Sequence, residues 1–224
     1  MFRIPTPDDP ETYEQLIQWF ARAFRQRSPQ FDEEDVVRRI TQLRKDPSLI
    51  ESMMPQLSES IIGVIHKEYR VYCLSTKSDS ALMWAHYSDN HTGVCLEFSC
   101  DNLVLGSALE VQYREEYPLY DVTDGTIQNG LLPFCSKSSV WSYENEYRVI
   151  AQEKSGVFPG LRTRKNFLKY PRGALKAVIM GCMMSPSNAD ELRGIFDQEF
   201  PCGAVELKRA VRTPNRYSLS IEKC

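Results

Sequence analysis

Two acidic residues in the segment Trp141–Arg148 are the residues best suited to chemistry in this chain. The segment reads Trp-Ser-Tyr-Glu-Asn-Glu-Tyr-Arg and leads into an apolar stretch. We predict a β-strand here, so Glu144 and Glu146 should point to the same face, because a strand alternates its faces with period two. Two like charges on one face repel each other unless cations, hydrogen bonds or a ligand compensate. Arg148 has the same parity and could neutralise one of them.

These carboxylates have two interpretations. In the functional one, Glu144 and Glu146 form a polar site together with Trp141, Arg148 and Lys137, which lies four residues before Trp141. Lys137 reaches the carboxylates only if the preceding turn folds back. In the other, the segment is an ordinary strand whose Glu–Arg contacts make one face soluble, since exposed ion pairs contribute only about 0–1 kcal/mol.

A second dense cluster of aromatic and polar residues lies around Trp84. A planar ligand could stack on Trp84 or Tyr87, while His86 and Asn90 supply hydrogen bonds. Histidine also transfers protons near neutral pH. The alternative is a short helix packed through its aromatic face and followed by a polar turn and a strand.

Several common kinds of site are not predicted. His86, His91 and Glu97 fit no familiar spacing of metal ligands, so we predict no metal site. The chain lacks a G-x-S-x-G motif, and none of its cysteines has the surroundings of a known nucleophile. It also lacks a G-x-G-x-x-G or Walker-type loop, which argues against ordinary dinucleotide folds and P-loop nucleotide hydrolysis.

The elements that must position these residues differ along the chain. Residues 10–66 carry apolar residues at three- and four-residue steps, which is typical of helices. A first helix is predicted to begin at Pro10 and to break at Ser28-Pro29, and a second to begin at the acidic turn 32–35. A third and a fourth helix are predicted at 47–54 and 57–66. Strands dominate after residue 68. They are predicted at 69–75, 92–98, 109–113, 144–152, 174–181, 204–208 and 217–221, with helices at 80–87, 127–136 and 187–200. The mixture predicts an α+β fold with a mixed, mostly antiparallel sheet core.

We expect two parts. Residues 1–67 would form a helical N-terminal segment, which packs beside or covers the rest and has no chemistry that we can name. Residues 68–224 would form an α+β domain that carries both candidate clusters. No internal repeat or low-complexity segment is visible.

The composition narrows the partners and the cellular location that we expect for the protein. The net charge of −3, with basic and acidic residues interspersed, gives no strong signal for a nucleic-acid partner, although a local patch is compatible with it. The sequence contains no run of about 18 apolar residues, so no membrane span is expected. The N-terminus lacks the apolar core of a secretory signal. The seven cysteines are odd in number and never spaced as C-x-x-C, which favours reduced thiols and a cytoplasmic location.

Three segments together resemble a known family. The first contains Cys73-Leu-Ser, Leu82-Met-Trp-Ala-His-Tyr-Ser and the strand from Gly93 to Phe98. The second contains Lys137 and Trp141–Arg148, and the third is Leu175-Lys-Ala-Val-Ile-Met-Gly181. They are similar to the bacterial domain-of-unknown-function 2971 family over about residues 70–182. The resemblance implies no reaction, because the family is named for lacking one. Members usually begin with a strand and turn that contain an Asn-Asp-Pro-like motif. Pro7-Asp-Asp-Pro10 only faintly matches it, so we expect that the chain is truncated at its N-terminus, that its start was misassigned or that this region has diverged.

The Glu144-Asn-Glu146 motif is also similar to the Glu-x-Glu motif of arginine-type ADP-ribosyltransferases, which would make the fold ADP-ribosyltransferase-like. The resemblance implies that Glu146 stabilises an oxocarbenium-like transition state and that Glu144 orients the acceptor. A fixed negative charge lowers the barrier where positive charge develops. Two other hallmarks of these enzymes, an early His or Arg strand and a Ser-Thr-Ser or Tyr element, are not identifiable in the chain.

Under this resemblance NAD would be a co-substrate. Trp84 or Tyr87 would stack its nicotinamide or adenine, and His86 and Arg148 would contact its polar groups. Such an NAD-consuming transferase or glycohydrolase, with an unknown acceptor, would suit a bacterial toxin or phage-defence effector.

The alternative is a non-catalytic ligand- or protein-binding module, in which both clusters form a structural polar network. The two hypotheses differ in geometry. The enzyme requires Glu146 and His86 at the rim of one open cleft, whereas the structural network requires buried carboxylates that are paired with Arg148.

Overall fold

The computed structural model describes residues 2–4, 9–27, 32–153, 161–201 and 203–224. The chain forms two compact units, and we describe each by itself. The first contains Met1–Tyr69 and Gln112–Ser139, and the second contains Arg70–Val111 and Val140–Cys224. The division at residues 67 and 68 that we expected from the sequence stays a prediction.

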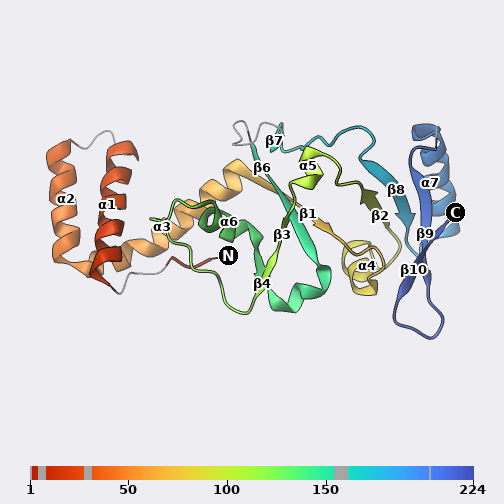
Figure 1. The fold of residues 1–224 in the computed structure, drawn as a ribbon, viewed down its shortest axis with the longest axis horizontal. Helices are drawn as coiled ribbons and strands as arrows, with labels where there is room; N and C mark the ends of the chain where they lie inside the picture. The colour runs from red at the N-terminus through yellow and green to blue at the C-terminus, as the bar shows by residue number, and fades with distance from the viewer. Residues whose placement is uncertain (1, 5–8, 28–31, 154–160, 202) are drawn as a thin grey trace. The chain divides into compact units, whose positions relative to one another are not determined.

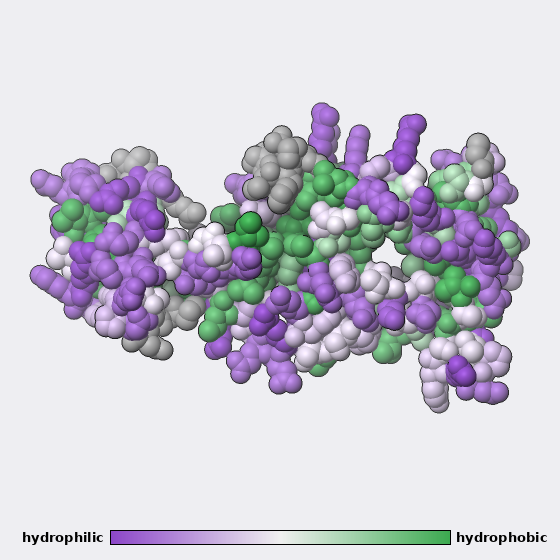
Figure 2. Space-filling model, in the orientation of Figure 1, coloured by the Kyte–Doolittle hydropathy of each residue, from purple (hydrophilic) through white to green (hydrophobic). Residues whose placement is uncertain are grey.

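Three helices build most of the first unit: α1 (Pro10–Arg27), α2 (Glu33–Lys45) and α3 (Pro47–Glu68). α1 and α2 lie side by side (Figure 1), and their apolar faces meet in a core that contains Ile17, Val36 and Ile50. The side chains on the face seen in Figure 2 are mainly hydrophilic over α1 and α2, as expected for amphipathic helices. The helix break that the sequence suggests at Ser28-Pro29 lies outside the described residues.

α3 corrects one prediction. The sequence suggested two helices separated near Pro55, but the structure has one helix of 22 residues with Pro55 inside it. A proline in a helix interior removes one hydrogen bond and costs about 3 kcal/mol. Ile50 and Met54 lie one helical turn apart just before Pro55, and both are buried in the core of the first unit. We attribute the continuity of α3 to this packing.

The predicted strand at 109–113 is also divided. β3 (Leu109–Glu110) pairs with a strand of the second unit, whereas β4 (Gln112–Arg114) pairs in parallel with β5 (Ser136–Ser138) in the first. α6 (Ile127–Cys135) leads directly into β5.

One sheet of the second unit has the strand order β10-β9-β8-β2. Its strands are β2 (Val94–Phe98), β8 (Leu175–Met180), β9 (Glu206–Arg212) and β10 (Leu219–Lys223). The β8–β9 pair is parallel and the other two pairs are antiparallel.

The two faces of this sheet are covered by different helices. Ile179 and Met180 follow each other on β8, so they point to opposite faces, and both are fully buried. Ile179 packs with Trp84 of α4 (Ala81–Tyr87), whereas Met180 packs with Ala189 of α7 (Pro186–Glu199). Figure 1 shows α7 beside this sheet. The sheet thereby fixes the position of α4, which carries half of the candidate site.

The second sheet of this unit has the order β1-β6-β3, and β7 (Arg162–Thr163) also pairs with β6. β1 is Tyr69–Ser75 and β6 is Glu146–Glu153. Val149 and Ala151 of β6 are buried beside Leu105 of the short helix α5 (Leu103–Gly106). The 3-10 helix η1 (Ser139–Glu144) precedes β6 and carries the other half of the candidate site.

The structure confirms the predicted fold class, an α+β fold with mostly antiparallel sheets and a helical segment at its N-terminus. The likeness to ADP-ribosyltransferases stays a prediction. Within the described ranges, no helix has both the length and the apolar character that a membrane span needs.

Candidate functional site

Trp84 anchors α4 to the core. Its side chain is only 3% exposed, and its indole Nε1 donates a hydrogen bond to the backbone oxygen of Ser78 at 2.7 Å. Ser80 begins the helix, because its hydroxyl accepts a hydrogen bond from the backbone N–H of Met83. A ligand could stack on Trp84 only if the ring left its place against the sheet, so the stacking role predicted for Trp84 or Tyr87 suits Tyr87 better.

His86 and Tyr87 lie on the exposed side of α4. An α-helix turns by about 100° per residue, so His86 lies about 200° around the helix axis from the buried Trp84. His86 is exposed, and Tyr87 keeps 62% of its surface accessible. Of the aromatic face that the alternative interpretation expected to pack, Trp84 is buried, whereas Tyr87 is exposed together with His86.

A strained turn follows α4. Asp89, Asn90 and His91 all have φ between 48° and 68°, in the left-handed region that side chains disfavour. The turn approaches the end of β8 so closely that a Cβ atom on Gly181 would lie 2.0 Å from the backbone oxygen of His91. Only glycine fits at 181 without a backbone shift, and the contact fixes the C-terminal end of α4.

η1 corrects the prediction that Glu144 and Glu146 share one face of a strand. Glu144 is the last residue of the 3-10 helix, and only Glu146 belongs to β6. Asn145 between them has φ of 45°, a left-handed conformation that asparagine tolerates well. The strand alternation on which the prediction depended therefore does not extend to Glu144.

Glu146 and Arg148 form the ion pair that their shared parity predicted. Arg148 Nε donates to Glu146 Oε1 at 2.7 Å, and Nη2 donates to Oε2 at 3.2 Å. The side chains are 4% and 16% exposed, so the pair is largely removed from water. This two-bond geometry is the strongest that an arginine and a carboxylate can form.

Glu144 connects the two candidate segments. Its side chain is buried, and Oε1 accepts a hydrogen bond from the Tyr87 hydroxyl at 2.7 Å. Its backbone oxygen accepts another from Ser75 Oγ on β1 at 2.5 Å. The structure thus brings together a carboxylate and a phenol that are 57 residues apart in the sequence.

Tyr87 also belongs to a group of four aromatic rings that meet at His86, and we call them the His86 cluster: His86, Tyr87, Trp141 and Tyr143. The imidazole centroid lies 6.0 Å from the Trp141 ring, and 6.3 Å from each of the two tyrosine rings. The Tyr143 ring is nearly parallel to the imidazole, at 29°. Sequence reasoning missed Tyr143, although its place two residues after Trp141 in the same motif was a signal that could have included it.

Lys137 lies in β5 of the first unit, opposite Tyr113 in the strand register. It therefore belongs to a different compact unit from the carboxylates, and the role that the sequence suggested for it stays a prediction. Among the residues that the structure describes, no group of three or more His, Cys, Asp or Glu side chains is arranged to hold a metal ion.

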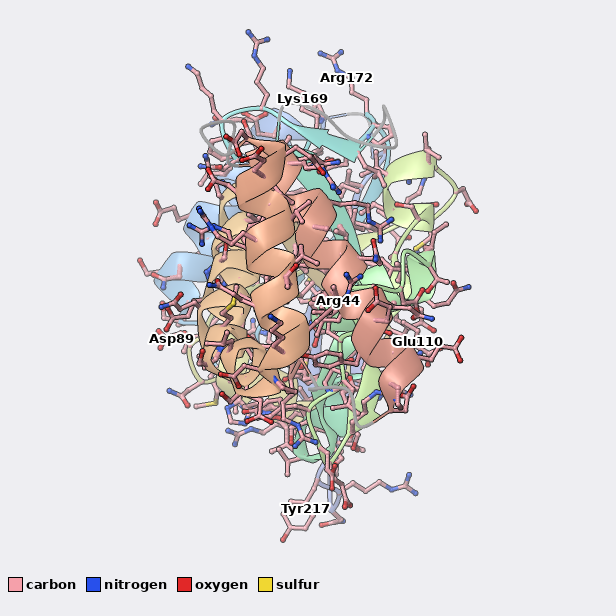
Figure 3. The ribbon with its side chains drawn as sticks, turned by 90° about the vertical axis from the view of Figure 1, so that its left-hand side faces the viewer. Arg44, Asp89, Glu110, Lys169, Arg172 and Tyr217 are labelled. Carbon is pink, nitrogen blue, oxygen red and sulfur yellow. The ribbon has the colours of Figure 1, made fainter. Side chains whose placement is uncertain are left out.

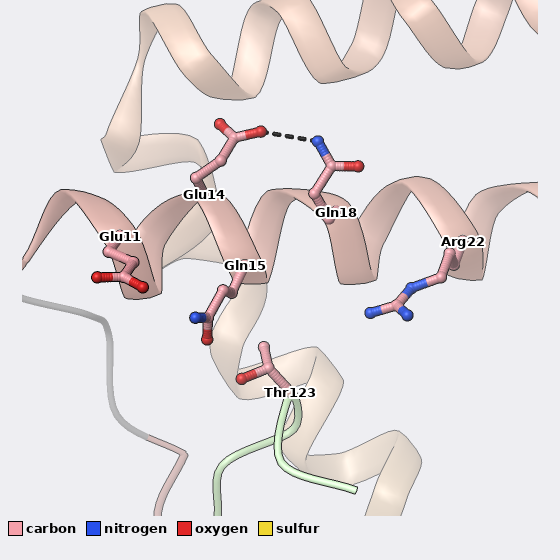
Figure 4. Close-up of a pocket in the computed structure, with 6 residues that line it drawn as sticks. All are labelled: Glu11, Glu14, Gln15, Gln18, Arg22 and Thr123. Atoms are coloured by element: carbon pink, nitrogen blue, oxygen red, sulfur yellow. Dashed lines mark hydrogen bonds between the residues drawn. The ribbon is translucent and has the colours of Figure 1, made fainter.

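The first unit has a polar groove of its own, with a volume of about 510 Å³ (Figure 4). It runs along α1. The lining residues are Glu11, Glu14, Gln15, Gln18, Arg22 and Thr123. Glu14 accepts hydrogen bonds from Gln18 at 2.7 Å and from Arg44, so its carboxylate is already engaged within the unit. No sequence pattern indicates this groove, because the residues that α1 contributes to it are ordinary polar positions of an amphipathic helix.

The comparisons with known proteins support one family. Residues 83–149 match a family model described as "Protein of unknown function (DUF2971)". The match confirms the resemblance to this family for residues 83–149. It extends from α4 to the middle of β6, so it spans the His86 cluster and both carboxylates. Neither the curated proteins nor the solved structures contained a significant match.

Proposed function

With residues 83–149 assigned to the DUF2971 family, we propose that the His86 cluster binds a planar heteroaromatic ligand of the nucleotide class, with the pyridinium ring of NAD as the best-suited example. In this function the buried carboxylates support the binding surface. This function corresponds to the non-catalytic ligand-binding module, which the sequence left open as the alternative to an enzyme.

The observation that carries the proposal is the convergence of four rings at one accessible place. Ring pairs in proteins interact at centroid separations of about 4.5–7 Å, and the His86 contacts fall in this range. Tyr87 is mostly exposed, and the Trp141 and Tyr143 side chains are partly exposed, so a flat ligand has accessible ring surface to cover. Aromatic faces also attract planar cations.

The carboxylates support this surface rather than line it. Glu144 holds the Tyr87 hydroxyl, and Glu146 holds the Arg148 guanidinium, while each glutamate is only 3% exposed. A buried charge requires partners, and a satisfied polar network gives its members fixed positions. The Glu144–Tyr87 hydrogen bond would thus hold the phenol ring in place before any ligand arrives.

Titration of the full chain with NAD, followed by tryptophan fluorescence and calorimetry, tests the proposal. We expect saturable binding that quenches Trp141 and that is weakened by at least tenfold, about 1.4 kcal/mol, in His86→Ala. Tyr117→Ala is the matched control, because Tyr117 is an exposed aromatic residue of the first unit. Equal weakening in both variants, or no binding by the wild type, would overturn the proposal.

A second candidate is the NAD-consuming reaction of ADP-ribosyltransferase type. The observation that favours it is the Tyr87–Glu144 hydrogen bond, because a nicotinamide on the Tyr87 ring would lie near a carboxylate. The bond between nicotinamide and ribose would break with its electrons leaving on nicotinamide. Glu146 would stabilise the positive charge on the ribose, and an acceptor oxygen or water would bond to that carbon and lose its proton. Glu146 would first have to exchange its hydrogen bonds with Arg148.

Nicotinamide release separates the two candidates. The reaction predicts release by the wild type and at least a hundredfold loss in Glu146→Gln, since one positioned electrostatic group contributes about 10²–10³ in rate. Binding without release supports the ligand-binding function alone. A releasing enzyme would fit a cytoplasmic toxin or phage-defence effector, the role that the sequence suggested for it.

A further inference from the structure

A basic segment of the second unit lies outside the candidate site. It reads Arg-Lys-Asn-Phe-Leu-Lys-Tyr-Pro-Arg from Arg164 to Arg172, with four cationic residues and no acidic one in nine positions. We call it the basic segment. It contrasts with the chain as a whole, whose net charge is −3. The function proposed above makes no use of it.

The basic segment begins with a tight hairpin. The backbone N–H groups and oxygens of Arg164 and Phe167 exchange two hydrogen bonds, at 3.0 and 3.1 Å. The two residues between them, Lys165 and Asn166, have φ of 52° and 68°. Two consecutive left-handed residues are the geometry of a type I′ turn. Lysine is disfavoured in this conformation, and disfavoured backbone is concentrated at functional positions.

Two residues outside the basic segment hold this turn in place. The Glu153 carboxylate at the end of β6 accepts hydrogen bonds from the backbone N–H groups of Lys165 and Asn166, at 3.2 and 3.3 Å, and from the Thr163 hydroxyl. Arg70 Nε donates to Asn166 Oδ1 at 2.8 Å. The hydrogen bond from the Thr163 hydroxyl is the main cause that lowers the pKa of Glu153. The Glu153 carboxylate is thus engaged by the hairpin itself, and it holds the backbone of Lys165 in place.

The side chains beyond the turn alternate between the core and the solvent. Leu168 packs against the core cluster that contains Val149, whereas Phe167 before it is 77% exposed. The Tyr170 ring rests edge-on against Phe98, with centroids 5.1 Å apart, and still keeps 48% of its residue surface exposed.

The four cationic residues are all exposed. Figure 3 shows Lys169 and Arg172 extending outward from the same end of the second unit. Two accessible rings and four accessible cations therefore share one short stretch of backbone that is anchored through Leu168 and Tyr170.

We propose that the basic segment binds single-stranded nucleic acid. Arg164, Lys165, Lys169 and Arg172 would contact successive phosphates, and Phe167 and Tyr170 would stack on bases. Proteins that bind single strands without sequence preference combine these two features, a cationic track for the backbone and aromatic side chains for the bases.

The same chemistry fits a single strand better than an anionic membrane surface. Peripheral membrane segments bury a broad apolar face, most often that of an amphipathic helix. The basic segment contains no helix, and its leucine packs against the core. Within this fully described segment, Phe167 is the large apolar side chain that solvent reaches most. One such ring suits base stacking but gives little area for lipid insertion.

The proposal can be tested by fluorescence anisotropy. The full chain is titrated into labelled oligothymidylate or oligouridylate of about 16 nucleotides. We expect binding that weakens as salt rises from about 50 to about 200 mM. The logarithmic salt slope should be about −2.8 for four phosphate contacts, at ~0.7 per contact. The double variant K169Q/R172Q should lose about half of this slope. Its matched control is R22Q/K45Q, which removes one exposed arginine and one exposed lysine from the first unit.

Stacking has its own test. Phe167→Ala should weaken binding about tenfold or more without changing the salt slope, because an alanine in place of a stacked ring costs affinity but no charge. Tyr117→Ala is its control.

The proposal is overturned if the oligonucleotides do not bind at the lowest salt, or if K169Q/R172Q and R22Q/K45Q lose the same slope. It is also overturned if vesicles that contain phosphatidylserine bind through the basic segment while the oligonucleotides do not. All variants change exposed side chains, and circular dichroism of each must match the wild type.

Discussion

The two units each contain a Glu–Arg pair with the same two-bond geometry and very different surroundings. In the second unit, Glu146 and Arg148 are 4% and 16% exposed. In the first, Glu14 and Arg44 are each 47% exposed, with nitrogen–oxygen distances of 3.1 and 2.5 Å. Geometry alone therefore does not distinguish them. Burial does, because breaking a buried pair leaves a charge without compensation, whereas water replaces a partner at the surface.

The difference also separates two uses of a carboxylate. Glu146 is buried, where it can fix the position of the Arg148 guanidinium. Glu14 lines an open polar groove and contributes little to the framework. A sequence motif with two glutamates and an arginine does not by itself say which use applies.

The largest expected effect comes from removing the buried guanidinium. Arg148→Met should lower the free energy of unfolding by about 3–5 kcal/mol, since it leaves the buried Glu146 without this partner. Urea denaturation measures the loss. Arg44→Met is the matched control and should cost about 0–1 kcal/mol. Similar losses in the two variants would show that burial does not distinguish the pairs.

A glycine from each unit extends the comparison from charge to packing. Gly181→Ala should destabilise the protein by about 2 kcal/mol or more, because its Cβ would lie 2.0 Å from the backbone oxygen of His91. Gly63 lies within α3 and has no neighbouring atoms within 4 Å of an added Cβ. Gly63→Ala should instead stabilise by about 0.5–1 kcal/mol. Thermal unfolding of both variants checks the opposite signs, and a loss in both would contradict the packing account.

The hydrogen bond between Tyr87 and Glu144 should have an intermediate effect. Tyr87→Phe removes a donor to a buried carboxylate and should cost about 1–2 kcal/mol. Tyr217→Phe, at a fully exposed tyrosine, should cost almost nothing. Chemical denaturation compares the two variants. If they are equally stable, Glu144 does not depend on the Tyr87 hydroxyl.

The smallest expected effect is the loss, at acidic pH, of the stability that Glu14 contributes. Hydrogen bonds from Arg44 and Gln18 lower the pKa of Glu14 in the folded protein. Its contribution to stability is therefore present above the ordinary pKa of a glutamate, about 4.3, and is lost as the pH falls through the lowered value. Glu14→Gln should be less stable than the wild type by about 0–1 kcal/mol at pH 7, and the difference should vanish in acid. A difference that grows as the pH falls would contradict the sign.

The sequence predicted the parts of the fold that depend on local periodicity. It located α1, α2, α4 and β8 closely, and it predicted the Glu146–Arg148 pair from strand parity. The pattern could not predict that α3 continues through Pro55, because the compensating contacts of Ile50 and Met54 come from tertiary packing.

The sequence predicted most of the residues that form the candidate site, but it did not predict which of them are buried. The family resemblance combined the two segments, and the structure joins them through Tyr87 and Glu144. The end of η1 at Glu144 depends on the left-handed conformation of Asn145, which strand alternation does not reveal. The burial of Trp84 depends on the sheet that packs against it, so no local pattern could separate it from the exposed Tyr87.

The most direct test of ligand binding at the His86 cluster is the NMR spectrum of the histidine side chains during a titration with NAD. The chain has three histidines, His66, His86 and His91, so His→Gln variants assign their imidazole signals. A planar ligand in the cluster should shift the His86 signal saturably and leave that of His66 in α3 unchanged. An unmoved His86 signal at saturating NAD, or equal shifts of all three, would contradict the account.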